Sequence, residues 1–293
     1  MNRQLVPRLG THVSIAGGFP EALNRAKRLS CATMQIFSRS PRGGPAPALD
    51  RDLLRAFDRQ RRAWDIAPLA VHCPYIINLA SPDRRTWGFS VALYQEEYAR
   101  CARLQADYLV THVGSHRGQG EEGGIARVAE ALTRTLAEHR TEVMILLENT
   151  AGAGQGLGYQ FEQLQAIRDG VTPRDRVGIC LDTAHLFAAG FAIHTAEGLD
   201  ATLEDFARII GLDHLKLLHL NDSKSAFNSR LDRHWHIGQG QIGLEGMRRI
   251  VNHPRLARVP RILETPKSTE AEDVRNLSTV RRLMKTRRSH APV

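Results

Sequence analysis

The feature that most limits how this chain of 293 residues can fold is a recurring pair of patterns. A short apolar run, which predicts a buried strand, is followed by a longer stretch of helical periodicity. The predicted strands are Leu9–Ile15, Thr33–Phe37, Pro68–His72, Tyr108–Val113, Val143–Leu147, Val177–Leu181, Leu215–Leu220 and Arg261–Leu263. The predicted helices are Glu21–Arg28, Leu49–Trp64, Val91–Leu104, Ile125–His139, Tyr159–Arg168, Leu203–Ile210, Leu244–Val251 and Glu270–Met284. Eight such units predict an α/β fold, a (β/α)8 TIM barrel with its active site at the C-terminal mouth of the strands.

An open, doubly wound parallel sheet is the alternative that the same pattern allows. Such a sheet commonly has a Gly-x-Gly-x-x-Gly turn after its first strand. This chain has Ser14-Ile15-Ala16-Gly17-Gly18 there, which does not match. We therefore favour the barrel, and we expect a single domain over residues 1–293 that ends in a basic tail of about residues 285–293.

Composition limits the class of protein. No apolar run is long enough to span a membrane, and residues 1–10 lack an apolar signal region. The four cysteines form no Cys-x-x-Cys pair, so we expect free thiols and a cytoplasmic location. The formal net charge of +9 is weak evidence for a polyanionic partner, and it gains weight if the acidic residues bind metal ions.

Ionisable residues stand at the C-terminal ends of six consecutive predicted strands, about one strand–helix unit apart. They are His72, His112, Glu148, Asp182, His219 and Glu264. In a barrel all of them converge on one mouth. His185 follows Asp182 closely, and Asp232-Arg233-His234 lies in the insertion before Glu264.

This set offers five imidazoles and four carboxylates without a thiolate, which suits zinc, manganese or iron. It exceeds what a single ion needs, so it predicts two or three ions. Clustered divalent ions activate water and stabilise both the attacking and the leaving oxygens in phosphoryl transfer. Without metal ions, four converging carboxylates would repel one another.

Three motifs resemble the endonuclease IV family of apurinic/apyrimidinic (AP) endonucleases, which are xylose isomerase-like TIM barrels. They begin at Leu181-Asp182-Thr183-Ala184-His185, at His219-Leu220-Asn221-Asp222 and at Asp232-Arg233-His234, the last being the most specific. Weaker support comes from Thr11-His12-Val13-Ser14, His72-Cys73-Pro74-Tyr75 and Glu148-Asn149-Thr150. The likeness covers about residues 9–266.

The resemblance implies three zinc ions per chain, with manganese or iron as possible substitutes. Its ligands divide into three sets: His72, His112 and Glu148; Glu148 as a bridge with Asp182, His219 and Glu264; and His185, Asp232 and His234. The metal-held carboxylates Glu148 and Glu264 are the implied catalytic residues, orienting a hydroxide that attacks the phosphorus 5′ to an abasic site. The products would be a 3′-hydroxyl and a 5′-deoxyribose phosphate, as in base excision repair.

The resemblance also implies that Arg42 and Tyr75 contact DNA, with duplexes that carry abasic sites or 3′-blocked ends as partners. An abasic nucleotide leaves the stack at low cost because no base is paired. Gly43-Gly44 departs from the bulkier polar or aromatic residues that the resemblance leads one to expect after Arg42. His116 and Arg117 are further candidates for phosphate contacts, and His12 for support of the ligands. A monomer is the family expectation.

A sugar isomerase or epimerase is the main alternative, because such enzymes also place Glu, Asp and His at strand ends of this barrel. They need one or two ions, and they are not expected to carry the Asp232-Arg233-His234 insertion. A catalytically inactive DNA-binding barrel is a third possibility, which the complete ligand set disfavours.

Overall fold

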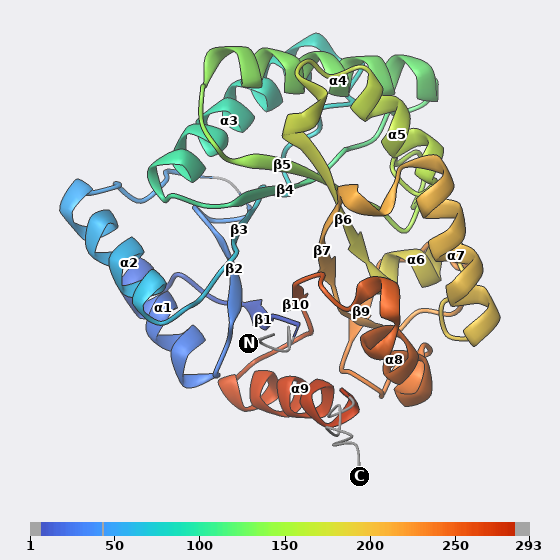
Figure 1. The fold of residues 1–293 in the computed structure, drawn as a ribbon. Coiled ribbons are helices and arrows are strands. Elements are labelled where there is room, and N and C mark those ends of the chain that lie inside the picture. Colours follow the sequence, from blue (N-terminus) through green and yellow to red (C-terminus); the bar gives the residue numbers. More distant parts are fainter. Residues whose placement is uncertain (1–6, 43, 285–293) are drawn as a thin grey trace.

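The computed structural model describes residues 7–42 and 44–284. Eight parallel strands form a closed barrel in the order β1-β10-β7-β6-β5-β4-β3-β2 (Figure 1). Their bounds are β1 Leu9–His12, β2 Thr33–Phe37, β3 Leu69–His72, β4 Tyr108–His112, β5 Met144–Glu148, β6 Val177–Asp182, β7 Leu215–His219 and β10 Arg261–Leu263. Because β1 pairs with β10 as well as with β2, the ring is complete. The predicted TIM barrel is confirmed, and the open sheet is excluded.

Helices surround the barrel (Figure 1). They are α1 Phe19–Arg28, α2 Arg51–Ala63, α3 Arg84–Arg103, α4 Glu121–Glu138, α5 Phe161–Asp169, α6 Thr183–Ala189, α7 Ala196–Ile209, α8 Gly243–Asn252 and α9 Glu270–Leu283. Side chains of Asp50, Asp83 and Thr195 accept backbone N–H groups and start α2, α3 and α7. The Asp83 cap explains why α3 begins about two turns before the predicted Val91.

The inside of the barrel contains a small apolar layer beneath the mouth. It consists of one residue from each of six strands: Ala70, Val110, Leu146, Cys180, Leu217 and Ile262. Side chains alternate between the two faces of a strand. The residues two positions further along are His72, His112, Glu148, Asp182, His219 and Glu264. These six side chains therefore point to the barrel axis, stacked directly above the apolar layer.

Two elements at the mouth were not predicted. The first is α6, which follows β6 without a loop, since Asp182 caps it by accepting the N–H of His185 at 2.8 Å. The second is an antiparallel hairpin of β8 Asp222–Ser223 and β9 His234–Trp235. The hairpin pairs Ser223 with His234, and so it fixes the insertion that carries the Asp-Arg-His motif.

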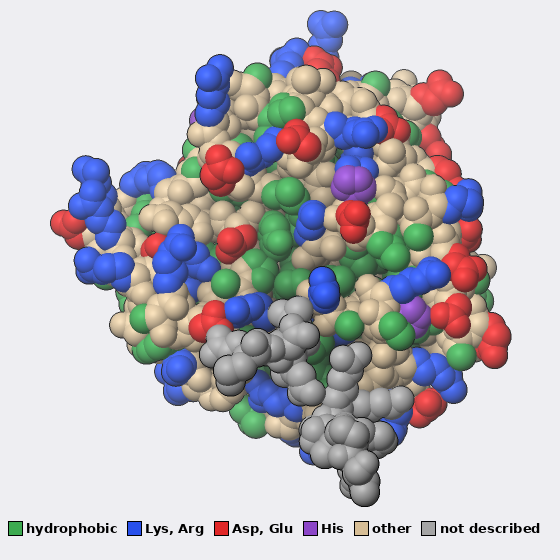
Figure 2. Space-filling model, in the orientation of Figure 1, with side chains coloured by type: hydrophobic (Ala, Val, Ile, Leu, Met, Phe, Trp, Pro, Cys, Tyr) green, Lys and Arg blue, Asp and Glu red, His purple; other side chains and the backbone are tan. Residues whose placement is uncertain are grey.

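The described residues on the face in Figure 2 form no single dominant charged patch. On the face seen in Figure 2, basic and acidic side chains are interspersed over the outer helices. None of the helices in the described part of the chain combines the length and apolar character needed to cross a bilayer. The four cysteines are buried and free. The predicted basic tail, residues 285–293, lies outside the described residues.

Candidate metal centre at the barrel mouth

All nine predicted ligands lie at the C-terminal mouth. Donor atoms of eight of them, all but Asp232, form three groups, within each of which the atoms lie no more than 4.8 Å apart. The groups are His72, His112 and Glu148; Glu148, Asp182, His219 and Glu264; and Asp182, His185 and His234. Each group has the nitrogen and oxygen donors that divalent zinc, manganese or iron accept. The third group contains Asp182, where the resemblance implied Asp232.

Glu148, at the end of β5, is the centre of the arrangement and is fully buried. Its Oε2 atom lies 3.2 Å from Nε2 of His72 and 3.0 Å from Nε2 of His112. Its Oε1 atom lies 2.8 Å from Nδ1 of His219. One carboxylate thus faces donors of two groups from its two oxygens, which is the geometry that a bridging ligand needs.

Asp232 lies at the edge of the third group and is half exposed. Its Oδ2 atom is 3.2 Å from Nε2 of His185, and its Oδ1 atom is 3.5 Å from Nε2 of His234. Nε2 of His234 is also 3.5 Å from Oδ2 of Asp182. Both aspartates therefore face the same two imidazoles, one from the barrel and one from the insertion.

Two of the histidines are held through their Nδ1 atoms by backbone carbonyl groups. Nδ1 of His72 donates to the carbonyl oxygen of Cys73 at 2.7 Å, and Nδ1 of His185 donates to that of Asn149 at 2.8 Å. In a neutral imidazole the other nitrogen is then an acceptor. Carbonyl groups that fix the ring of a metal-binding histidine in this way are typical of metal sites.

These ring orientations require a cation between the imidazoles and the carboxylates. The free lone pair of Nε2 in His72 points at a carboxylate oxygen of Glu148, so two acceptors face each other. The same holds for Nε2 of His185 and Asp232. Such contacts repel unless a cation lies between them, either a proton on the ring or a metal ion. The donor set therefore fits divalent ions, which satisfy several of these contacts at once.

The pKa shifts of the buried groups, in the absence of metal ions, also indicate that positive charge is stabilised at this site. Burial would raise the pKa of Glu148, but charges and hydrogen bonds from His219 and His112 hold that pKa well below its usual range. Burial would lower the pKa of His185, but Asp182, Asp232 and Glu148 raise it to about 10. A metal ion bound at His185 would therefore displace a proton at neutral pH.

Four polar residues near the candidate ligands were assigned no role from the sequence. They are Gln35, Asn149, Asn221 and Asp222, and all are buried. The side chain of Asn221 donates to Oδ2 of Asp182 at 2.6 Å and accepts the N–H of Glu264 at 2.7 Å, so one amide connects two ligands. The usable signal was a polar residue inside or directly after an apolar strand.

Asp222 has a different task. Its carboxylate accepts backbone N–H groups of Ser223, Gly238, Gly240, Ile242 and Gly243 at 2.8–3.4 Å. It faces no candidate metal position, and instead gathers the segment that follows the Asp-Arg-His motif. A Cβ atom on Gly240 would lie 2.5 Å from Oδ1 of Asp222, which explains the glycine there.

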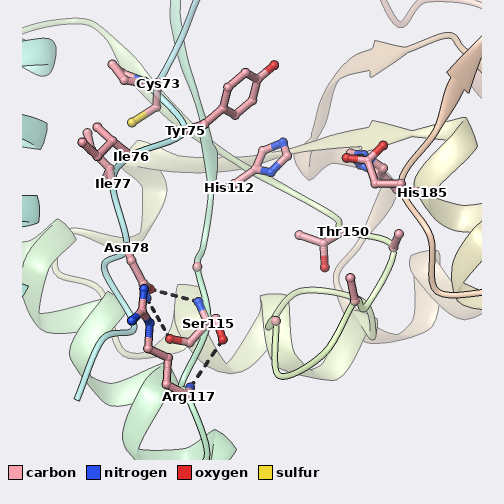
Figure 3. A pocket seen from close by; sticks show the side chains of 16 residues that line it. Cys73, Tyr75, Ile76, Ile77, Asn78, His112, Ser115, Arg117, Thr150 and His185 are labelled. Carbon is pink, nitrogen blue, oxygen red and sulfur yellow. Dashed lines mark hydrogen bonds and ion pairs between the residues drawn. The ribbon is translucent and has the colours of Figure 1, made fainter. Parts of the chain in front are cut away.

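A cavity of about 490 Å³ opens beside the ligands, between the loops that follow β3, β4 and β5. His112 and His185 extend into it from opposite sides, while Arg117 lies at its far end beside Asn78 and Ser115 (Figure 3). Tyr75 is 62% exposed, and its ring contacts those of His72 and His112 at centroid distances of 5.4 and 5.9 Å. The neighbouring Ile76, also exposed, was not singled out from the sequence.

Arg42 is exposed on the loop after β2. Strand β2 pairs with β3, and Tyr75 lies on the loop after β3. His12 lies at the end of β1, and its Nδ1 atom is 3.8 Å from Oε1 of Glu264, in keeping with a supporting position. His116 accepts the N–H of Gly120 through Nδ1, so that ring shapes the loop after β4.

Comparison with known proteins identifies the family. A family model described as xylose isomerase-like TIM barrel matches residues 23–286. The chain is 45% identical over 253 residues to a probable endonuclease 4 of Chloroflexus aurantiacus, covering 86% of this chain and 89% of the relative. The chain belongs to the endonuclease IV family.

A crystal structure of endonuclease IV from Thermus thermophilus agrees with this assignment. It matches with a TM-score of 0.84 and 37% sequence identity, covering 94% of this chain and 98% of that one. A D-tagatose 3-epimerase-like protein also matches, with a TM-score of 0.66 but only 16% identity, covering 94% and 96%. The second likeness shows the shared barrel alone.

Proposed function

We propose that this endonuclease IV family member is a zinc-dependent AP endonuclease of base excision repair. It hydrolyses the phosphodiester 5′ to an abasic site in duplex DNA and leaves a 3′-hydroxyl and a 5′-deoxyribose phosphate. It also removes blocking groups from 3′ ends. The observation that carries the proposal is the convergence of nine candidate nitrogen and oxygen ligands, with Glu148 at their centre, in a chain whose relatives are named as endonucleases.

Three zinc ions would occupy the three groups, with manganese or iron as substitutes. His72, His112 and Glu148 would hold the first; Glu148, Asp182, His219 and Glu264 the second; and Asp182, His185, Asp232 and His234 the third. When bound, such ions lower the pKa of water and stabilise negative charge on phosphoryl and leaving oxygens.

The chain's own residues define how DNA meets this site. We assign Glu148 and Glu264 to orienting the attacking water, since both carboxylates lie at the centre of the mouth. Exposed Arg42 and Tyr75 would contact the duplex at the lesion, and the ring of Tyr75 packs beside those of His72 and His112. The net charge of +9 favours association with a polyanion.

The test is a labelled duplex with a single abasic site, incubated with the protein as purified and after treatment with a strong chelator. We expect one nick 5′ to the abasic site, loss of nicking after chelation, and recovery when zinc is added. An undamaged duplex of the same sequence is the matched control. Absence of nicking by a fully metal-loaded protein would overturn the proposal.

Elemental analysis separates this function from sugar isomerisation. We expect about three zinc ions per chain, whereas one ion together with turnover of a ketose or aldose would support the isomerase. We also propose that the chain acts as a monomer and a single folding unit. Light scattering with and without DNA checks the first point, and one cooperative unfolding transition of the metal-free protein checks the second.

A further inference from the structure

We propose that Gln35 is a positioning residue that determines which nitrogen of His219 faces the metal centre and holds Glu264 beside it. This inference rests on the metal binding proposed above. Gln35 lies in the middle of β2, at a register position between His12 of β1 and Ala70 of β3, and its side chain is fully buried. It is the one strand residue of the described mouth whose amide contacts two candidate ligands.

The amide of Gln35 has three contacts. Its Nε2 group donates to Oε1 of Glu264 at 2.6 Å and lies 3.0 Å from Nδ1 of His12. Its Oε1 atom lies 2.8 Å from Nε2 of His219. His219 and Glu264 belong to the same group of candidate ligands, so one side chain spans two members of one group.

The orientation of this amide follows from its partners. A carboxylate only accepts hydrogen bonds, so the group of Gln35 that faces Glu264 has to be the donor, Nε2. The carbonyl oxygen of Gln35 is then turned to His219. Nε2 of His219 therefore carries the proton and donates it to Gln35, which leaves Nδ1 as the atom with a free lone pair.

That lone pair faces the centre of the site. Nδ1 of His219 lies 2.8 Å from Oε1 of Glu148 and 3.0 Å from Oε2 of Glu264. His72 and His185 instead present Nε2, because backbone carbonyls hold their Nδ1 atoms. At His219 the side chain of Gln35 fixes the protonated nitrogen, as backbone carbonyl groups do at His72 and His185. A side chain, unlike a backbone carbonyl, can be replaced by mutation.

Loss of the Gln35 amide would remove two constraints at once. His219 could exchange its proton between the two nitrogens, and Glu264 would lose its shortest hydrogen bond. The group of Glu148, Asp182, His219 and Glu264 would then hold its ion less firmly. The group of His72, His112 and Glu148 has no contact with Gln35 among the described interactions and would keep its ion.

The test uses the zinc-loaded protein and Gln35→Met, which keeps the length of the side chain but removes its hydrogen bonds. Thr33→Val is the matched control: Thr33 lies on the same strand, is buried, and donates to the carbonyl oxygen of Pro68 at 2.6 Å, away from the ligands. Native mass spectrometry follows zinc retention over time in a chelator. We expect Gln35→Met to release one ion at least about tenfold faster than wild type, the usual scale for such partners, while the control follows wild type.

Cadmium NMR of the cadmium-loaded proteins provides a second measurement, because one of three resonances should shift or broaden in Gln35→Met. Gln35→Asn, whose shorter amide cannot reach both partners, replaces it if Gln35→Met does not fold, and the same single-ion loss is expected. Equal release rates in wild type and variant would overturn the role of Gln35. A wild-type protein that binds no zinc would instead overturn the proposed function.

Discussion

Glu97 of α3 and Arg39, directly beyond β2, form an ion pair whose side chains are 0% and 5% exposed. Oε2 of Glu97 also accepts the hydroxyl of Ser38 at 2.6 Å. Arg100 donates to the carbonyl oxygens of Ser38 at 2.7 Å and of Pro47 at 3.0 Å. This buried cluster therefore holds both ends of the loop that carries Arg42, and so fixes the position of that loop relative to α3.

Glu97→Gln should weaken DNA binding more than chemistry. Neutralising Glu97 leaves the buried Arg39 paired only with the exposed Glu96 and should lower the free energy of unfolding by about 2 kcal/mol, the scale of a hydrogen bond to a charged group. With the Arg42 loop less well held, KM for an abasic duplex should rise several-fold, while kcat stays within about twofold. Steady-state kinetics and urea unfolding measure the two effects. Glu96→Gln, which alters the exposed partner of Arg39, is the control, and an equal rise in KM there would contradict the prediction.

His234→Ala should remove one ion and most of the turnover. Nε2 of His234 lies 3.4 Å from Nε2 of His185, within the third group of ligands. Even partners one shell away from a metal contribute about 10–100-fold to activity, so a direct ligand should contribute more than about 100-fold. Elemental analysis measures the lost ion, and single-turnover nicking measures the lost activity. Affinity for the duplex should change less than kcat. His139→Ala, at the end of α4, should leave both unchanged; full zinc content in His234→Ala would exclude His234 as a ligand.

Asp222→Asn should destabilise the fold without altering the ligand set. The amide group would replace one carboxylate oxygen, and at least two backbone N–H groups among those of Gly238, Gly240, Ile242 and Gly243 would lose their acceptor. Each unpaired buried donor costs about 1–3 kcal/mol, so the free energy of unfolding should fall by about 3 kcal/mol. Urea denaturation of the metal-free protein measures it. Asp213→Asn, at an exposed position, is the comparison, and equal stability of the two variants would be evidence against the anchoring role.

Stability should decline in alkali through a buried thiol. Burial raises the pKa of Cys31 from 9.0 to about 11. The unfolded chain therefore loses this proton first, so the contribution is intact below pH 9 and is lost as the pH rises from 9 to about 11. Within that window the free energy of unfolding should fall by about 1.4 kcal/mol per pH unit from this group. Urea unfolding of wild type and Cys31→Ala tests it, since the variant should show a shallower decline; parallel curves would show that Cys31 ionises normally.

Much of the fold followed from local patterns. Thr33–Phe37 and Arg261–Leu263 were predicted with the bounds that the structure has, because buried strands are marked by apolar runs between polar ends. The structure does not extend β1 beyond His12, although the apolar pattern continued to Ile15. No periodicity marked α6, since all seven of its residues are buried and the helix has no polar face.

The ligands could be predicted because strand order alone places strand ends at one mouth. The supporting residues could not, since Gln35 gains its role only from Glu264 and His219, which are distant in sequence and adjacent in the barrel. Asp222 stood inside a recognised motif, yet four of its five backbone partners depend on the path of the segment after β9. Such contacts depend on the tertiary structure, so they produce no regular spacing of residues in the sequence.

The closure of β1 against β10 has a consequence for incomplete chains. The candidate ligands are distributed from β3 to the residue after β10, and Glu264 comes late in the sequence. A chain interrupted during synthesis, or cut by a protease before β10, would lack that carboxylate together with the strand that seals the ring. The complete ligand set, and with it the proposed ability to cut DNA, therefore arises only in the finished barrel.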